Sequence, residues 1–468
     1  MPTTDGAVEP SAGAVLSDQN QIKVNAAQIV ARIERMPMTR FHIRARLVIG
    51  TATFFDALDA LAIAYVMPVL APLWQLSPTQ VGTLISIGFL GQVLGSILFG
   101  WVAERWGRMA ALTWSIVIFS VFSLLCALAW DYNSLFVLRA LQGIGLGGEV
   151  PIAAAYINEI SKAHGRGFFV MIYEFAFNVG LFFAALLGVL LVPTVGWQSM
   201  FLIGVAPLML VAFMRRDLPE SPRWLVNQGR LEQANRVVTW IEEQARLYGK
   251  ELPPIMIRPI VERRSDWREL FRGIYRGRTL VVWVMWVATY FVTYGLMTWT
   301  PTLYSTVFKL PLQQALLLPL LTLFISVSTG LAVAFLIDRT GRRAWFTGAF
   351  LFTAIPLLIL WMLGAGSASL VWWFVTIGAW FIATNAGALY LYTPELYPTR
   401  MRAFGSSLAS VWVRIASAIG PIVTGLIVAQ HSFATVFLVM GIVPLIGALV
   451  TWLFAIESGN QVLEEISP

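Results

Sequence analysis

Long apolar stretches separated by short polar segments make up most of the chain. A helix needs about 20 consecutive, mostly apolar residues to cross a lipid bilayer. Twelve stretches reach this length, which predicts an all-α membrane protein with twelve transmembrane helices at about 47–73, 80–101, 110–130, 134–158, 167–192, 197–214, 279–307, 312–337, 344–364, 369–393, 403–428 and 432–455.

A polar stretch divides this pattern in the middle. It contains one amphipathic segment, Arg230 to Leu247, whose apolar residues recur every three to four positions, as on one face of a helix. The predicted organisation is therefore an N-terminal tail (1–45), a first six-helix bundle (46–214), a linker with an amphipathic helix (215–278), a second six-helix bundle (279–456) and a C-terminal tail (457–468).

The composition favours lipid as the surrounding solvent. Of the 468 residues, 58% are hydrophobic and 12% are charged, whereas a soluble domain carries about 25% charged residues. The polar residues are too few to cover so large an apolar core in water. A soluble enzyme is therefore excluded.

Few residues suit metal, disulfide or nucleotide chemistry. The single Cys126 permits no intrachain disulfide, and the three histidines, at positions 42, 164 and 431, lie far apart. The sequence has no nucleotide-binding loop, and residues 1–40 lack the apolar region of a signal peptide. We expect no cofactor, no metal and no ATP-driven pumping, and we expect the first apolar helix to direct insertion.

The net charge of +7 reflects orientation in the membrane. With the N-terminus on the cytoplasmic side, all of the 32 Lys and Arg residues fall in cytoplasmic segments except Arg139, Lys309 and Arg414. Cytoplasmic loops carry an excess of Lys and Arg. We therefore predict that both termini are cytoplasmic, and the charge requires no nucleic-acid partner. Short outer loops without an Asn-x-Ser/Thr site suit a bacterial inner membrane.

A motif occurs in both halves of the chain. GWVAERWGR (100–108) follows the second predicted helix, and AFLIDRTGR (334–342) follows the eighth. A second pair has a similar offset, because Glu159 precedes Arg166 by seven residues and Glu395 precedes Arg402 by seven. Repeats of this kind indicate two six-helix halves of one architecture.

At these motifs the chain resembles the major facilitator superfamily. PESPRW (219–224), PELYPTR (394–400) and the Arg139…Glu159 pair are typical of the branch that holds sugar porters, organic-ion carriers and synaptic-vesicle-2 proteins. Within that branch the chain is similar to bacterial niacin (nicotinate) permeases, on FDALD (55–59), GGEVP (147–151), YGLMTW (294–299) and YTPE (392–395). The resemblance covers about 45–455 and implies the major facilitator fold, with two pseudo-symmetric six-helix bundles.

One departure from the sugar porters bears on the substrate. Those proteins carry a Gln-Gln pair and then an Asn on the seventh helix, where this chain has Ala288, Thr289 and Tyr294. A sugar would lose hydrogen-bonding partners, whereas a flat aromatic ligand would gain a ring to stack on.

Ionisable residues inside predicted helices give the main functional signal. Each costs about 2.5–3.5 kcal/mol at the centre of a spanning helix. They must therefore face a bundle interior or a water-filled pathway, and they are Asp56, Asp59, Arg139, Glu149, Glu174 and Arg414.

Four of them are candidates for proton coupling. Asp56 and Asp59 lie three residues apart, on one face of the first helix, and two nearby carboxylates resist simultaneous ionisation. The resemblance to proton-coupled relatives assigns Asp59 and Arg139 to a switch; the alternative is a static ion pair that fixes helix packing. For Glu149 we expect a role in coupling or in lining the cavity.

The candidate substrate ligands lie near mid-membrane between the halves, where such carriers bind substrate. Arg414 could anchor a carboxylate, or pair structurally with Glu174 or another acid. The aromatic stripes could instead belong to the core. The set is Tyr173, Glu174, Asn178, Tyr290, Tyr294, Thr298, Trp299, Asn385, Tyr390 and Arg414.

The charged loop motifs are candidates for a gate. We expect them to form cytoplasmic ion pairs across the two halves, several acting together because exposed pairs each contribute little. They are Glu104, Arg105, Arg108, Glu159, Arg166, Asp338, Arg339, Arg342, Glu395, Arg400 and Arg402.

Together these features predict a monomeric secondary active transporter. We expect it to import a small organic acid, nicotinate or a similar aromatic monocarboxylate, in symport with a proton by alternating access. The alternatives are a proton-coupled sugar or polyol symporter and an exporter of organic ions or drugs. A membrane enzyme or receptor is disfavoured, because an enzyme would need clustered His, Asp or Ser groups at one membrane face.

Overall fold

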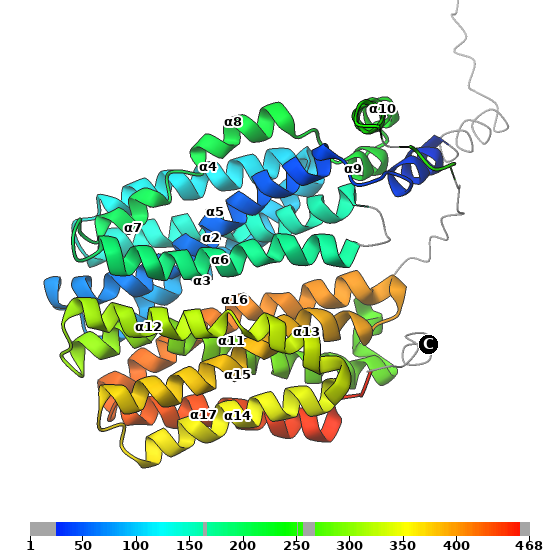
Figure 1. Ribbon diagram of the computed structural model, residues 1–468. Helices are drawn as coiled ribbons and strands as arrows, with labels where there is room; N and C mark the ends of the chain where they lie inside the picture. The colour runs from blue at the N-terminus through cyan, green and yellow to red at the C-terminus, as the bar shows by residue number, and fades with distance from the viewer. Residues whose placement is uncertain (1–24, 162–165, 250, 256–266, 459–468) are drawn as a thin grey trace, which may run out of the picture.

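The computed structural model is mostly helical in the part that it describes. That part comprises residues 25–161, 166–249, 251–255 and 267–458. It does not include the side chains of 166–174, 215, 267, 331, 334, 399, 400 and 403. A helical segment, 25–34, comes first. The elements that follow (Figure 1) are α2 (Arg40–Leu73), α3 (Pro78–Trp106), α4 (Arg108–Ala127), α5 (Tyr132–Ile160), α6 (Arg166–Leu191), α7 (Gln198–Ile203), α8 (Leu208–Asp217), α9 (Pro222–Asn227), α10 (Leu231–Leu247), η1 (Trp267–Phe271), α11 (Gly273–Thr306), α12 (Leu312–Ser326), α13 (Thr329–Thr340), α14 (Arg342–Met362), α15 (Ala368–Glu395), α16 (Thr399–Gln430) and α17 (Ala434–Phe454).

These helices account for all twelve predicted spans. Among the described residues, nine helices are long and apolar enough to cross a membrane. Three shorter apolar stretches, Phe175–Leu191, Gln198–Met214 and Leu312–Ser326, occupy the fifth, sixth and eighth predicted positions. The all-α fold expected from the apolar pattern is confirmed.

Two spans expected as single helices are broken. The sixth is split into α7 and α8 by a turn at 204–207, which ends at Pro207, a residue without a backbone donor. The eighth is split into α12 and α13 next to a run of hydroxyl side chains. Ser326, Ser328 and Thr329 each donate to a carbonyl three or four residues earlier. Such bonds compete with the helical backbone pattern and bend helices.

The two halves of the chain form two groups of helices that lie side by side. Helices α2–α8 form one group and α11–α17 the other (Figure 1). The boundary between them is made by α3 against α16, α2 against α11, and α6 against α12.

The boundary is closely packed at the end where α3 begins and α16 ends. A Cβ added at Gly82 would lie 2.6 Å from the carbonyl oxygen of Pro421, and one at Gly425 would lie 2.6 Å from that of Pro78. The Trp299 indole donates to the same Pro421 carbonyl at 3.0 Å. The halves are therefore in backbone contact at this end.

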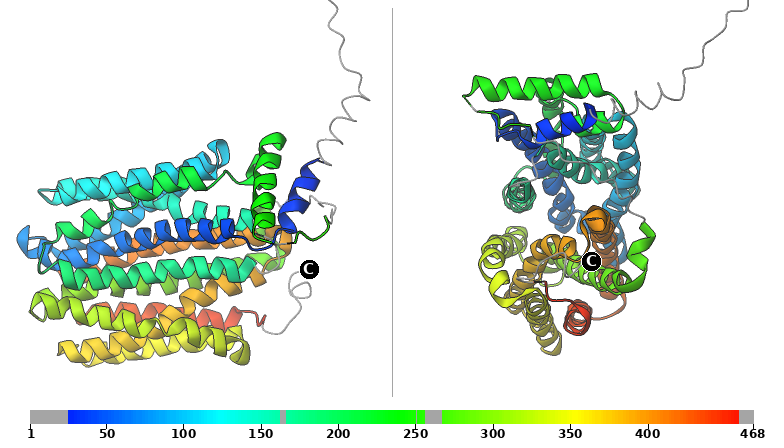
Figure 2. Two further views of the ribbon diagram at one scale, coloured as in Figure 1. Left: turned by 45° about the horizontal axis from the view of Figure 1, so that its top comes forward. Right: turned by 90° about the vertical axis from the view of Figure 1, so that its right-hand side faces the viewer.

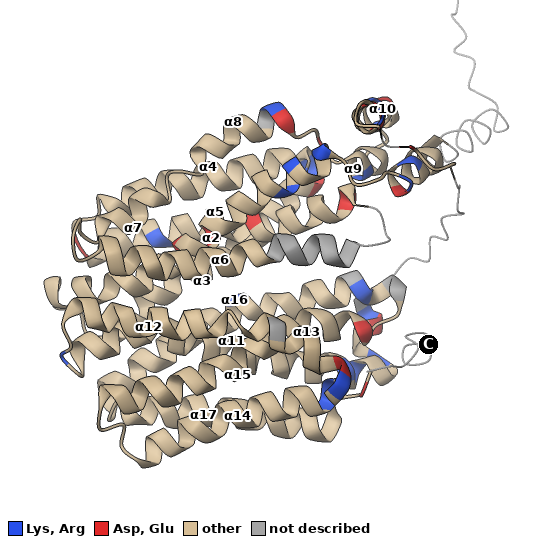
Figure 3. Cartoon of the chain, viewed as in Figure 1, with Lys and Arg blue, Asp and Glu red and all other residues tan. Residues whose placement is uncertain are grey.

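Most charged residues lie toward the opposite end of the bundle (Figure 3). We call it the charged end, and the other the uncharged end. Helix α10 lies across the charged end, crosswise to the spans (Figure 2). As predicted, one face of α10 is buried, through Ala234, Val238, Ile241 and Ala245.

The segment 25–34 is attached to α10 by an ion-pair cluster. Arg32 and Arg35 each place a guanidinium nitrogen 2.7 Å from the Glu242 carboxylate, and Ile29 and Ile33 belong to the same apolar cluster as Val238 and Ile241. Burial opposes ionisation of Glu242, but the bonds from both arginines outweigh it and hold its pKa below the usual value. These two segments form a cap on the first half.

Candidate functional site

Asp59 and Arg139 form a buried ion pair inside the first half. Asp59 is fully buried on α2, and its Oδ2 accepts from Arg139 Nη1 of α5 at 3.3 Å. Gln142 Nε2 donates to Asp59 Oδ1 at 2.8 Å, and Ser123 Oγ of α4 donates to it at 3.1 Å. The predicted pair thus exists, with Gln142 and Ser123 as partners that the sequence analysis missed. Gln142 could have been found, because it lies one helical turn after Arg139.

Two glycines leave room for this cluster. A Cβ at Gly88 of α3 would lie 3.0 Å from Arg139 Nη2, and one at Gly204 would lie 2.2 Å from the Ser123 hydroxyl. Any side chain at Gly204 would therefore displace Ser123 from Asp59. The cluster has a fixed shape, which suits both a switch and a packing role.

Asp56 lies in different surroundings from Asp59, although both are on α2. The residue is 4% exposed, and Oδ1 has no hydrogen-bond partner in the described part of the chain. The opposite charge that acts on it is that of Arg414, on α16 of the other half. Three residues along a helix turn the side chain by about 60°, so one acid faces α5 and the other the boundary between the halves.

Arg414 joins the two halves near the middle of the bundle. Its Nη1 donates to Oε1 of Gln92, which lies halfway along α3. Arg414 was predicted from the sequence but Gln92 was not, although it is the one amide side chain in the apolar stretch 84–101. A guanidinium and an amide from the two halves therefore meet at the boundary, and the charge of Arg414 also acts on Asp56 of α2.

A row of aromatic rings lies beside this group. On α11, Trp286 stacks on Tyr290 with ring centroids 5.6 Å apart, and Tyr290 stacks on Tyr294 at 6.3 Å. Phe89 of α3 meets the edge of Tyr294 at 5.0 Å, across the boundary, and Tyr390 of α15 meets Trp286 at 4.9 Å. Charges on Asp56 and Arg414 act on Tyr294. The predicted tyrosines and arginine thus share one neighbourhood.

Glu149 of α5 bonds a residue of α2. Its side chain is fully buried, and Oε1 accepts from Thr53 Oγ1 at 2.9 Å. Both residues belong to the first half. The structure therefore places the Glu149 carboxylate against α2.

The remaining predicted ligands are dispersed. Thr298 donates to the Tyr294 carbonyl of its own helix at 2.6 Å, whereas the Trp299 indole donates to the Pro421 carbonyl of α16 and so links two helices. Asn178 is exposed on α6. Asn385 is fully buried, and neither polar side-chain atom has a partner among the described residues. The side chains of Tyr173 and Glu174 lie outside the described residues.

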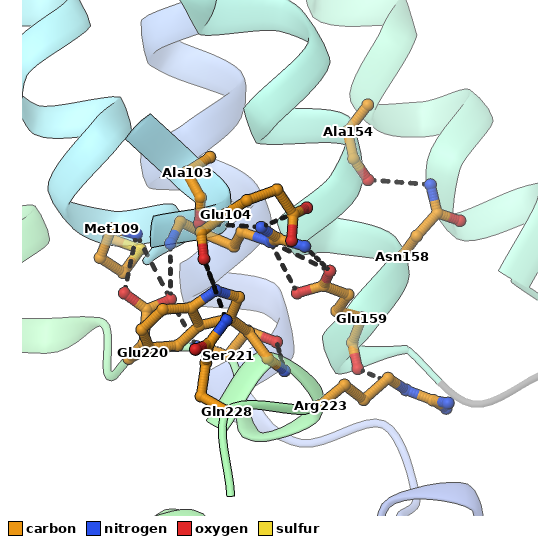
Figure 4. A network of polar contacts seen from close by, with 12 residues as sticks. Ala103, Glu104, Met109, Ala154, Asn158, Glu159, Glu220, Ser221, Arg223 and Gln228 are labelled. Atoms are coloured by element: carbon orange, nitrogen blue, oxygen red, sulfur yellow. Dashed lines mark hydrogen bonds and ion pairs between the residues drawn. The ribbon is translucent and has the colours of Figure 1, made fainter. Parts of the chain in front are cut away.

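The predicted gate residues pair within each half. Arg108 bonds Glu159 at 2.9 Å and Glu104 at 2.8 Å (Figure 4). In the second half, Arg342 bonds Glu395 at 3.2 Å and Asp338 at 2.6 Å. Among the described residues, every ion pair of these gate candidates lies within one half, and the expected pairs across the halves are not present there. In each half the arginine begins one helix and the acid ends another helix of the same half: Arg108 begins α4 and Glu159 lies at the end of α5, as Arg342 begins α14 and Glu395 ends α15. The arginine therefore pairs within its own half.

Two acids missed by the sequence analysis complete these networks. Glu220 accepts from the Arg108 amide at 2.9 Å (Figure 4), and Glu457 accepts from the Arg342 amide at 2.8 Å. Each carboxylate satisfies free amides at a helix N-terminus.

The other gate candidates take little part in these networks. Among the described residues Arg105 and Arg339 form no ion pair, and Arg402 bonds a backbone carbonyl at 3.4 Å. The side chains of Arg166 and Arg400 lie outside the described residues.

Comparison with known proteins agrees with this architecture. Residues 40–468 match the family described as "Sugar (and other) transporter". The niacin transporter NiaP of Acinetobacter baylyi is 34% identical over 449 residues, which cover 94% of this chain and 99% of that protein. The synaptic vesicle 2-related protein of Xenopus laevis is 29% identical over 93% of this chain and 82% of its own length.

A solved structure has the same fold. The xylose transporter XylE from E. coli, in a partially occluded inward-open conformation, superimposes with a TM-score of 0.70 at 18% identity, over 89% of this chain and 100% of that chain. The chain is a multi-pass membrane transporter, not an enzyme, and it belongs to the sugar (and other) transporter family of the major facilitator superfamily.

Proposed function

We propose that this protein imports a small aromatic monocarboxylate, nicotinate or a close relative, together with a proton. One observation carries the proposal: Arg414 bonds Gln92 of α3 at the boundary between the halves, and one helical turn along α3 the ring of Phe89 meets Tyr294, which stacks on Tyr290. A guanidinium binds a carboxylate with two parallel hydrogen bonds, and stacked rings suit a flat ring. The likeness to a niacin transporter supports the same substrate class.

The proton step is assigned to Asp59 and Arg139. Neutralising Asp59 would remove its attraction for Arg139, so a proton and the ion pair compete for the same carboxylate. Asp56 has no hydrogen-bond partner at Oδ1 among the described residues and is acted on by the charge of Arg414, so we assign it as the second acid that takes up a proton when an anion binds. Glu149 is assigned to the cavity wall beside Thr53.

The closed boundary at the uncharged end supports transport by alternating access. Contacts at Gly82 and Gly425 close that end, and we assign the charged end to the cytoplasm because Lys and Arg concentrate there. Substrate then enters or leaves between halves that rock about the site.

Uptake into proteoliposomes tests the proposal. Labelled nicotinate should accumulate when an inward proton gradient is imposed and only equilibrate without it, and benzoate should compete. Xylose serves as the control, because sugar or polyol symport is the second candidate and rests on the family match. Gradient-driven accumulation of xylose with no uptake of either acid would overturn the proposal.

A further inference from the structure

Gln92 is a buried polar residue that the proposed mechanism does not yet use. Its side chain is 7% exposed on α3, in the first half, and accepts from Arg414 of the second half. Its backbone is fixed against α5, because a Cβ at Gly147 would lie 2.2 Å from the Gln92 carbonyl oxygen. The amide is therefore held at the boundary by close helix packing.

The contact between Gln92 and Arg414 is one that an anion can replace. A neutral amide oxygen offers the guanidinium one acceptor, whereas a carboxylate offers two oxygens and a full charge. Asp56 acts on Arg414 electrostatically, but its Oδ1 makes no hydrogen bond within the described part of the chain. An incoming carboxylate would thus displace an amide and would not have to break a hydrogen-bonded ion pair at that oxygen.

We propose that Gln92 is a placeholder for the substrate carboxylate on Arg414 and thereby determines specificity for anions. In the unloaded protein the amide satisfies the guanidinium and links the halves. A carboxylate takes its place and breaks that link, whereas an uncharged analogue does not. This inference rests on the proposed function and assigns a residue to its binding step.

Chemical labelling of Arg414 in the absence of substrate tests whether the Gln92 amide occupies the guanidinium in the unloaded protein. Phenylglyoxal modifies accessible guanidinium groups, and mass spectrometry of the full-length protein in detergent gives the rate at Arg414. Gln92→Leu should raise that rate about threefold or more, and Gln92→Glu should lower it. Ser96 lies one turn further along α3, and its hydroxyl donates to the Val93 carbonyl. Ser96→Ala is the control, and its labelling rate at Arg414 should match that of the parent protein. Gln92→Asn, which is too short to reach, provides a second variant should Gln92→Leu fold poorly.

Nicotinate binding, measured by calorimetry, tests whether a carboxylate displaces the Gln92 amide from Arg414. Gln92→Leu should bind nicotinate about tenfold more tightly, because a hydrogen bond to a charged group no longer has to be broken. Gln92→Glu should bind it at least about tenfold more weakly, and nicotinamide affinity should not change in either. Weaker nicotinate binding by Gln92→Leu would make Gln92 a direct ligand and overturn the inference.

The two measurements separate this inference from the proposed function. If labelling responds to Gln92 but no protein binds nicotinate, the substrate assignment fails and the Gln92–Arg414 contact stands. If labelling of Gln92→Leu equals that of the parent protein while nicotinate is still accumulated, the placeholder is wrong and the transport function stands.

Discussion

Arg342 occupies in the second half the position that Arg108 occupies in the first. Arg108 lies 2.9 Å from Glu159, and Arg342 lies 3.2 Å from Glu395. Each arginine also pairs with the acid four residues earlier in the sequence. The backbone amide of each arginine donates to a glutamate more than 100 residues away in the sequence. Both halves are therefore braced internally at the charged end, which suits two groups of helices that rock as units.

A double-mutant cycle tests this internal bracing. Arg108→Gln and Glu159→Gln should each lower stability, and their effects should be non-additive by about 1–3 kcal/mol, as for hydrogen bonds to charged groups. The effects of Arg108→Gln and Glu395→Gln should simply add. Melting temperatures of the purified variants provide the measurement, and strong coupling between Arg108 and Glu395 would instead favour pairing across the halves.

Asp59→Asn should abolish gradient-driven accumulation while sparing exchange. The amide can still accept bonds from Gln142 and Ser123 but cannot take up a proton. Nicotinate uptake under an imposed proton gradient, compared with counterflow in preloaded proteoliposomes, measures the two activities. An equal loss of both would identify the Asp59–Arg139 pair as structural.

Arg414→Lys should weaken nicotinate binding by about tenfold or more. Lysine keeps the charge but cannot offer the planar pair of donors that a carboxylate prefers. Calorimetry with nicotinate, with nicotinamide as the uncharged comparison, measures the effect. Arg339→Lys at the exposed charged end is the matched control, and unchanged nicotinate affinity in Arg414→Lys would refute the anchor.

Gly425→Ala should shift the protein away from the state closed at the uncharged end. The added Cβ would lie 2.6 Å from the Pro78 carbonyl oxygen, so α3 and α16 could not pack as they do. Spin labels at Trp130→Cys and Ser432→Cys, in a Cys126→Ser background, should report a longer distance. Gly348→Ala is the control, because a Cβ there meets nothing within 4 Å.

Glu242→Gln should loosen segment 25–34 from α10. The amide loses its charge-assisted bonds with Arg32 and Arg35, and hydrogen exchange of residues 25–34 should increase. The pKa of Glu242 is held below its usual value. The ionised carboxylate therefore stabilises the cap fully at any pH above that usual pKa. Protection should therefore fall as the pH drops through the lowered pKa, and a Gln variant should lose this pH dependence.

Residue type and spacing were sufficient to predict the twelve apolar spans and the repeated motif, but not the breaks within the sixth and eighth spans. In lipid each span must satisfy its own backbone bonds, so apolar length along the chain defines the span. The buried charges could be recognised in the same way, because Asp59, Arg139 and Arg414 are costly in apolar segments unless a bundle shields them.

Which of these groups meet depended on the rotation and depth of helices that pack against one another. Gln92 and Arg414 are 322 positions apart and touch only because α3 packs on α16. Asp56 and Asp59 share a helix yet face different neighbours, and Arg108 pairs within its own half. Contacts between helices depend on how side chains interlock in three dimensions, which periodicity along one helix does not specify.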